Sequence, residues 1–545
     1  MNPRRIKRRR LLQETALGAG ALAVGAPYFF VRSAGIPANA GLETFEHVVV
    51  LMMENRSFDN MLGYLYGPGR LPRGQRFEGV EGKSLSNPIP RDADQAHRRV
   101  VPVAKGYVMH DPKPDPGEEY PHVNTQLFGT VRPASNRFKD AVSMAAPFNA
   151  PDPMPTRPPM NGFVADYIDN FHRLANRAPT YDEYAIIMRS FPPDAVPVIS
   201  ALAHGFAVCD HWHCAVPSQT FCNRAFFHAA TSSGWVVNEP YARWVKQNTA
   251  ETVFERLDGS WRIYYDLEDI VPLTVLIHFP RLRRYIETNV RPMADFYADV
   301  RSGNLPKYAF VEPRLFWKHN DEHPPSATFQ LGKISVGAHS SVLAGEVLIS
   351  EVYNAIRTAQ SARGSNWQNT LFLITYDEHG GCYDHVPPPA AVPPDPGRPA
   401  GEMAFRFDRL GVRVPAVVIS PYVEPGTVIR TSLDHNSVLR TFSEKWGIPP
   451  LTRRDRASPS LAGIFNRSIP RRPPTWPVTK PRPLPAVTND RDPLNELQRA
   501  ALHAVGALVG ATDRALAEVG TIRQALQFIR RAVDSSAFKK EKTRD

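Results

Sequence analysis

The sequence predicts an α/β fold built on a mostly parallel sheet, and two observations lead to this prediction. Short unbroken runs of β-branched and aliphatic residues end abruptly in polar or turn residues, which is typical of parallel strands buried on both faces. Between these runs lie helix-like stretches with apolar residues at three- and four-residue steps, as in 339–359. Strands that alternate with helices favour a central sheet with helices on both faces. The predicted strands are 47–53, 308–313, 370–378 and 415–421.

The first 40 residues predict an export signal. A basic segment that ends in Arg8, Arg9 and Arg10 precedes a short apolar, small-residue stretch, and this order resembles a twin-arginine signal. Residues 38–40 (Ala-Asn-Ala) form a small-x-small cleavage site. The protein is therefore expected to be periplasmic or secreted, with the twin-arginine export machinery as a partner. An uncleaved membrane anchor is the alternative, although the stretch is shorter than the roughly 20 residues that usually span a bilayer.

Much of the basic character of the chain lies in this signal. The 545 residues carry a formal net charge of +11, and residues 1–40 contain seven basic residues and one acidic residue. Their removal lowers the charge to about +5, which gives no ground for predicting nucleic-acid binding. A mildly cationic surface is compatible with transient contact with an anionic membrane surface.

The composition of the remaining chain predicts three regions. Residues 41–465 are expected to form the main α/β domain, which carries the candidate catalytic residues below. Residues 466–492 are too rich in proline for a helix or a central strand and predict an extended connection. Residues 493–545 predict a helical tail that packs on the core, with contact between its amphipathic face and a membrane as the alternative.

Four cysteines lie in the mature part of the chain: Cys209, Cys214, Cys222 and Cys382. Export permits a disulfide such as Cys209 with Cys214 or Cys222. A zinc site near Cys209 and Cys214 is the alternative, but the paired spacing typical of zinc ligands is missing there.

Acidic and amide side chains mark the ends of two predicted strands. Glu54 and Asn55 follow one of them, and Asp377 and Glu378 end the other. Because open parallel sheets place their ligand sites at the carboxyl ends of strands, we expect these four side chains to converge. They offer oxygen ligands alone, which predicts one divalent cation: calcium, magnesium or manganese. The alternative is that each acid caps a helix or lies in solvent.

The segment 217–234 places polar residues in an apolar and aromatic neighbourhood. Thr220 is a candidate nucleophile, because near neutral pH a hydroxyl reacts only when a metal or a base draws off its proton. Asn223 lies three residues further on, on the same face of a helix that begins here. The alternative is that Ser218 or Thr220 simply caps this helix.

As a set, six motifs resemble those of a bacterial and plant phosphoesterase family that includes non-haemolytic phospholipases C and a periplasmic acid phosphatase. The motifs follow the family order. They are 54–63, 220–224, 318–326, 376–389, 412–423 and 434–447.

This resemblance implies an alkaline-phosphatase-like sandwich and a metal-dependent phosphoric ester hydrolase with a phospho-threonine intermediate. The implied substrates are phospholipids, cleaved as by a phospholipase C, and the alternative is an acid phosphatase that acts on phosphomonoesters. By motif, Asn223 would contact a phosphoryl oxygen and His323 would lie beside the substrate. We expect a histidine, with His323 as the first choice, to protonate the leaving alcohol, because an imidazole near its reference pKa can serve as an acid. The implied metal ligands are Glu54, Asn55, Thr220, Asp377 and Glu378.

Two positions depart from the family pattern. Cys222 stands where many relatives have proline, so the local backbone is expected to be less rigid. Glu118 stands where many relatives have the histidine of a DPxH motif, which puts part of the substrate pocket in doubt and leaves His110 or His122 as the expected substitute.

Three further histidines, His379, His385 and His435, are candidates for acid catalysis, and a loop-stabilising role is the alternative for each. A binding protein that has lost catalysis would lack at least one of the metal or nucleophile residues, and none is missing. A sulfatase would need a C-x-P-x-R sequence, which the chain does not contain.

Overall fold

The computed structural model describes residues 41–269, 271–315, 319–324, 329–331, 334–336, 342–395, 397, 400–484, 491 and 493–534. The predicted export signal and the end of the predicted tail fall outside these ranges, so the signal stays a prediction. Every helix within them is too short or too polar to cross a membrane.

An eight-stranded sheet forms the centre of the protein. Its strands are β1 (His47–Met53), β6 (Ala207–Cys209), β8 (Trp261–Tyr265), β9 (Val290–Pro292), β10 (Tyr308–Val311), β13 (Thr370–Tyr376), β14 (Ala416–Ile419) and β15 (Thr427–Ile429). Their order in space is β15-β6-β14-β13-β1-β10-β8-β9. Seven strands run in one direction and β14 runs against them. The predicted α/β fold with a mostly parallel sheet is therefore confirmed.

The direction predicted for 415–421 is wrong. This segment forms β14, which is antiparallel to both β13 and β6. A parallel neighbour needs a crossover that returns the chain to the opposite end of the sheet, usually through a helix. The described part of 377–415 contains one short 3₁₀ turn, η6 (Glu402–Ala404), and no α-helix. The chain therefore re-enters the sheet at the end where β13 leaves it.

Helices cover both faces of the sheet, and the alternation of strand side chains separates the two faces. Tyr264 of β8 packs on Phe296 of α12 (Met293–Ser302), with ring centroids 5.2 Å apart. Phe310 of β10 pairs with the preceding residue of β8 and points to the other face, where it packs 4.6 Å from His228 of α6 (Thr220–Ala229). Two further helices extend these layers: α13 (Val342–Thr358) contacts α12, and α14 (Asn436–Trp446) contacts α6.

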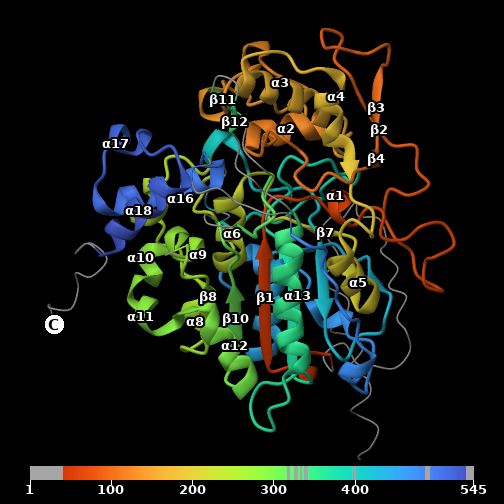
Figure 1. Cartoon of the computed structure of the whole chain (residues 1–545), viewed down its shortest axis with the longest axis vertical. Coiled ribbons are helices and arrows are strands. Elements are labelled where there is room, and N and C mark those ends of the chain that lie inside the picture. The colour runs from red at the N-terminus through yellow and green to blue at the C-terminus, as the bar shows by residue number, and fades with distance from the viewer. Residues whose placement is uncertain are drawn as a thin grey trace, which may run out of the picture. The chain divides into compact units, whose positions relative to one another are not determined.

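A second group of helices lies beyond the carboxyl end of β1 (Figure 1). Its members are α2 (Tyr120–Phe128), α3 (Phe163–Ala175) and α4 (Tyr181–Tyr184). They enclose a small apolar cluster of their own, to which Val123, Leu127 and Phe163 belong. Tyr383, from the loop after β13, packs into this cluster, so the second group is joined to the end of the sheet that carries the predicted site.

The tail forms three helices, α16 (Glu496–Val509), α17 (Asp513–Ala517) and α18 (Ile522–Asp534). The tail is not helical throughout, because residues 518–521 leave the helix and separate α17 from α18. Leu497 and Val505 of α16 belong to the main apolar core, so this helix packs on the core. The domain boundaries at 465 and 492 stay predictions.

The remaining elements are short. The helices are α1 (Phe58–Leu62), α5 (Pro197–Gly205), α7 (Ala242–Gln247), α8 (Val253–Arg256), α9 (Leu273–Ile277), α10 (Phe279–Leu282), α11 (Ile286–Asn289) and α15 (Arg453–Ala457). The strands are β2 (Ser86–Pro88), β3 (Val100–Pro102), β4 (Ala104–Lys105), β5 (Arg189–Ser190), β7 (Trp212–His213), β11 (Phe329–Leu331), β12 (Ile334–Val336) and β16 (Leu433–Asp434).

All four cysteines are buried and carry free thiols. The disulfide that export permits between Cys209 and Cys214 or Cys222 is therefore not formed. Cys222 lies inside α6, where its thiol donates to the carbonyl oxygen of Trp235 at 3.5 Å.

Candidate active site

The ends of β1 and β13 bring the predicted site residues together. Because Met53 pairs with Tyr376 across the two strands, the residues that follow them leave the sheet side by side. The backbone N–H of Asn55 donates to Asp377 Oδ1 at 3.1 Å. Thr220, the first residue of α6, donates its hydroxyl to Glu54 Oε2 at 3.3 Å. The five residues predicted as metal ligands are all buried.

Unpaired oxygen atoms indicate that a cation fits here. Among the described residues, Asn55 Oδ1, Asp377 Oδ2 and Glu378 Oε1 are buried side-chain oxygens that accept no hydrogen bond. A buried carboxylate oxygen without a partner is costly, and hard divalent cations prefer oxygen ligands. The predicted residues therefore fit a hard divalent cation.

A different group has a tighter spacing of potential ligand atoms. In the described chain, Asp59, Asp384 and His385 bring such atoms within 4.8 Å of one another. Buried Arg413 lies 2.9 Å from each of the two carboxylates. Although burial opposes the charged ring, Asp59 at 2.6 Å raises the pKa of His385 to about 9. Because these cations already neutralise the carboxylates, we interpret the group as an ion-pair network that fastens the loop after β13 to α1.

Arg224 is a site residue that the sequence analysis missed. Its guanidinium pairs with Glu54 and lies 3.8 Å from both Asp377 and Glu312. Burial raises the pKa of Glu54 well above its usual value; Arg224 opposes this shift and Asp377 adds to it. The spacing could have revealed Arg224, because it lies four residues after Thr220 on the same face of α6.

Asn223 holds the turn that precedes α6. Its Oδ1 accepts from the backbone N–H of Val216 at 3.0 Å, and its Nδ2 donates to the carbonyl oxygen of Ser218 at 2.6 Å. These contacts position Thr220 through the backbone. The predicted contact between Asn223 and a phosphoryl oxygen stays a prediction.

His323 lies against the predicted metal ligands. Its Nδ1 donates to the carbonyl oxygen of Pro324 at 2.7 Å, so the neutral ring presents Nε2 as an acceptor, 3.1 Å from Asn55 Nδ2. Burial lowers the pKa of His323. The described tautomer is thus ready to accept a proton at Nε2, whereas the predicted role as general acid requires the protonated ring.

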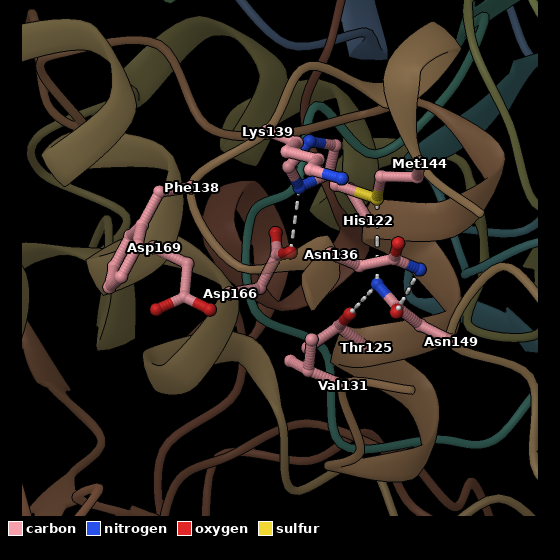
Figure 2. A pocket seen from close by; sticks show the side chains of 10 residues that line it. All are labelled: His122, Thr125, Val131, Asn136, Phe138, Lys139, Met144, Asn149, Asp166 and Asp169. Atoms are coloured by element: carbon pink, nitrogen blue, oxygen red, sulfur yellow. Dashed lines mark hydrogen bonds and ion pairs between the residues drawn. The ribbon is translucent and has the colours of Figure 1, made fainter. Parts of the chain in front are cut away.

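Glu118 accepts a hydrogen bond from Asn55 Nδ2, so the departure from the DPxH pattern lies at the site itself. His122, one of the two expected substitutes, pairs instead with Asp166 of α3 at 2.8 Å, as Figure 2 shows. Burial, and after it the neighbouring Glu378, raises the pKa of Glu118 well above its usual value.

The other candidate histidines make loop-stabilising contacts. His379 donates Nε2–H to Gln126 of α2 at 2.7 Å, and burial lowers its pKa to about 4. His435 donates Nε2–H to the carbonyl oxygen of Asp377 at 2.6 Å and accepts from Trp212 Nε1 at 3.2 Å. Both rings are therefore held neutral beside the site.

Known proteins resemble this chain over most of its length. The model of the phosphoesterase family matches residues 45–449. Non-specific phospholipase C3 of Arabidopsis thaliana is 32% identical over 487 residues, which cover 85% of this chain and 82% of that protein. Phospholipase C A of Mycobacterium tuberculosis is 25% identical over 513 residues, which cover 85% and 86%. A solved structure of an alkaline phosphatase superfamily protein from Vibrio parahaemolyticus has a TM-score of 0.28 and 13% identity, over 48% of this chain and 64% of that chain, a likeness too low to support an argument.

Proposed function

The chain belongs to the phosphoesterase family and is a phosphoric ester hydrolase, and from this premise we propose that it cleaves phospholipids as a phospholipase C does, through a phospho-threonine at Thr220. The names of the two relatives, which this chain covers over 82% and 86% of their length, support the substrate class. The observation that carries the mechanism is the hydrogen bond from Thr220 to Glu54 at the ends of β1 and β13.

In the first half of the reaction, Thr220 Oγ attacks phosphorus and the bond from phosphorus to the alcohol oxygen breaks. The Thr220 proton leaves along its hydrogen bond to Glu54 Oε2. Thr220 also stands at the amino-terminal end of a ten-residue helix, where the helix dipole favours the added phosphoryl charge.

A divalent cation held by the five predicted ligands would supply positive charge that lowers the pKa of the Thr220 hydroxyl and offsets charge on the phosphoryl oxygens. Calcium, magnesium and manganese all suit these oxygen ligands. We propose that the site holds one such ion.

His323 carries the remaining proton. In its protonated form it donates from Nε2 to the departing alcohol, and in the second half Nε2 accepts a proton from the water that opens the phospho-threonine. The proton on Glu54 then returns to Thr220, so both residues regain their starting forms.

The proposed location is the periplasm or the exterior of the cell, reached through the twin-arginine machinery. Its support is the sequence pattern of residues 1–40. A lipid substrate also requires transient contact with a membrane surface, which is part of the proposal.

The test uses purified mature protein with phosphatidylcholine and with p-nitrophenyl phosphate, before and after removal of metal by a chelator. We expect phosphocholine release that is lost with the metal and restored by a divalent cation. Thr220→Ala should lower turnover by about three orders of magnitude or more, whereas Thr220→Ser keeps the hydroxyl and should retain activity. Phosphate release from the monoester alone would favour the acid phosphatase alternative, and near-normal turnover by Thr220→Ala would reject the nucleophile.

A further inference from the structure

The tail contacts the residue that directly precedes the proposed nucleophile. Glu496, the first residue of α16, accepts a hydrogen bond from Gln219 Nε2 at 3.1 Å. Gln219 is the N-cap residue of α6, the helix that begins with Thr220. The family match ends at residue 449, so this contact comes from a part of the chain outside the matched region.

Gln219 joins the start of α6 to two other segments. Its Oε1 accepts from the backbone N–H of Asn238 at 2.9 Å, while its Nε2 donates to Glu496. Asn238 Oδ1 in turn accepts from the backbone N–H of Phe221 at 3.0 Å, and the carbonyl oxygen of Gln219 accepts from the backbone N–H of Asn223 at 3.1 Å. The side chain of Gln219 therefore links the start of α6, where Thr220 lies, to the segment 237–242 and to the tail.

A second contact makes the same connection. The ring of Tyr241 lies 6.0 Å from Phe221 of α6 and 5.5 Å from His503 of α16, measured between ring centroids. The segment 237–242 also borders a cavity of about 860 Å³, whose lining includes Leu516 of α17. The segment is therefore hydrogen-bonded directly to α6 and contacts α16 through Tyr241, on the side that borders the cavity.

We propose that α16 belongs to the catalytic apparatus, with Glu496 as a positioning residue that fixes Gln219 and thereby aims Thr220 Oγ at phosphorus. The inference rests on the proposed function, because it requires Thr220 to be the nucleophile. Glu496 acts through Gln219 and not on the substrate. Loss of its side chain should therefore reduce the rate of the chemical step and leave substrate binding almost unchanged.

The charge state of Glu496 suggests the matched variant. Burial and the neighbouring Glu119 raise the pKa of Glu496 to about 8. A largely neutral carboxyl at pH 7 resembles a glutamine amide in size and still offers a carbonyl acceptor to Gln219. Glu496→Gln should therefore rescue what Glu496→Ala loses.

The experiment measures kcat and KM of the full mature chain with its metal, using phosphatidylcholine and a chromogenic phosphodiester. Glu496→Ala and Gln219→Ala should each lower kcat by about tenfold to a hundredfold, the scale of a small misplacement of a reacting group, with KM changed less than about twofold. The double variant should be no worse than Gln219→Ala alone, because Glu496 acts only through the Gln219 side chain. Glu518→Ala, which removes an exposed acid that follows α17, is the matched control and should behave as wild type.

Full activity of Glu496→Ala, a loss confined to KM, or additive losses in the double variant would each overturn the inference. If Glu496→Ala does not fold, the comparison of Gln219→Ala with Glu496→Gln decides, because the first should lose kcat and the second should keep it. Thr220→Ala separates the two proposals. If Thr220→Ala stays active, Thr220 is not the nucleophile and both proposals fail. If Thr220→Ala is inactive and Glu496→Ala is fully active, only the proposed role of α16 fails.

Discussion

Gly380, in the turn after β13, lies too close to a predicted metal ligand to accept a side chain. Its φ is +58°, and a Cβ at this position would lie 2.1 Å from the carbonyl oxygen of Asn55. Such contacts essentially never fall below 3.0 Å, so in Gly380→Ala the Asn55 backbone or the turn must move by at least about 0.9 Å. Asn55 itself holds a φ of 55°, which leaves its backbone few alternatives.

Two effects of this substitution can be separated. The left-handed backbone alone makes alanine about 1 kcal/mol less stable than glycine. A displacement of about 1 Å in a group that positions the reaction can cost about a hundredfold in rate. Gly447→Ala is the matched control, because Gly447 has a φ of +68° and no heavy atom within 4 Å of its Cβ position.

The assay compares both variants with wild type for kcat/KM on a chromogenic phosphodiester, for the Mn²⁺ concentration that restores half of the activity after chelation, and for thermal unfolding. Gly447→Ala should lose about 1 kcal/mol of stability and keep its activity. Gly380→Ala should lose about a hundredfold in kcat/KM and need more Mn²⁺. If the two variants keep equal activity and equal metal requirement, the close approach to Asn55 does not matter for the site.

Two further predictions concern buried charges. Burial disfavours the charged form of His122, but Asp166 at 2.8 Å outweighs this effect and raises the pKa of His122 from 6.5 to about 9 (Figure 2). The ion pair therefore adds about 3 kcal/mol to the free energy of unfolding below pH 6.5, and this contribution is lost as the pH rises through about 9. The stability difference between wild type and His122→Gln should therefore narrow over this range in thermal unfolding; a constant difference would contradict the ion pair. Arg224→Met leaves Glu54 uncompensated and should cost about 3–5 kcal/mol with chelator, much of it recovered with Mn²⁺. Arg454 is the control, because its buried guanidinium donates to backbone carbonyls. The stability lost in Arg454→Met should therefore be the same with and without Mn²⁺. If the stability lost in Arg224→Met is also independent of Mn²⁺, the result contradicts a cation beside Glu54.

The sequence predicts the central strands well because their signal is local. The run 47–53 has the bounds of β1 itself, and all its residues after His47 are buried, as expected of a strand covered on both faces. The direction of β14 is not local, because it depends on whether the preceding connection crosses the sheet. Prolines in 386–401 mark that connection as a loop, and a loop without a crossover helix already argues for an antiparallel return.

The site divides in the same way. Glu54 and Asp377 stand out in the sequence because an acid at the end of a hydrophobic strand needs a partner. Arg224 is marked in the sequence only by its spacing of four residues from Thr220. Glu496 does not stand out, since glutamate on a helix is common and its contact appears only with tertiary structure. Glu118 is intermediate: its position is visible as a departure from the family pattern, but its hydrogen bond with Asn55 is not.

The charges at the site bear on the choice between diester and monoester substrates. The guanidinium of Arg224 lies beside the carboxylates of Glu54, Asp377 and Glu312, and buried Glu378 follows Asp377. When all four acids are ionised, their charge exceeds that of Arg224 and a divalent cation by one. A phosphodiester then adds one negative charge, whereas a fully ionised phosphomonoester adds two. Because each uncompensated charge in a water-poor site is costly, the monoanion is easier to accommodate. This balance favours a phospholipid over a phosphomonoester as the substrate.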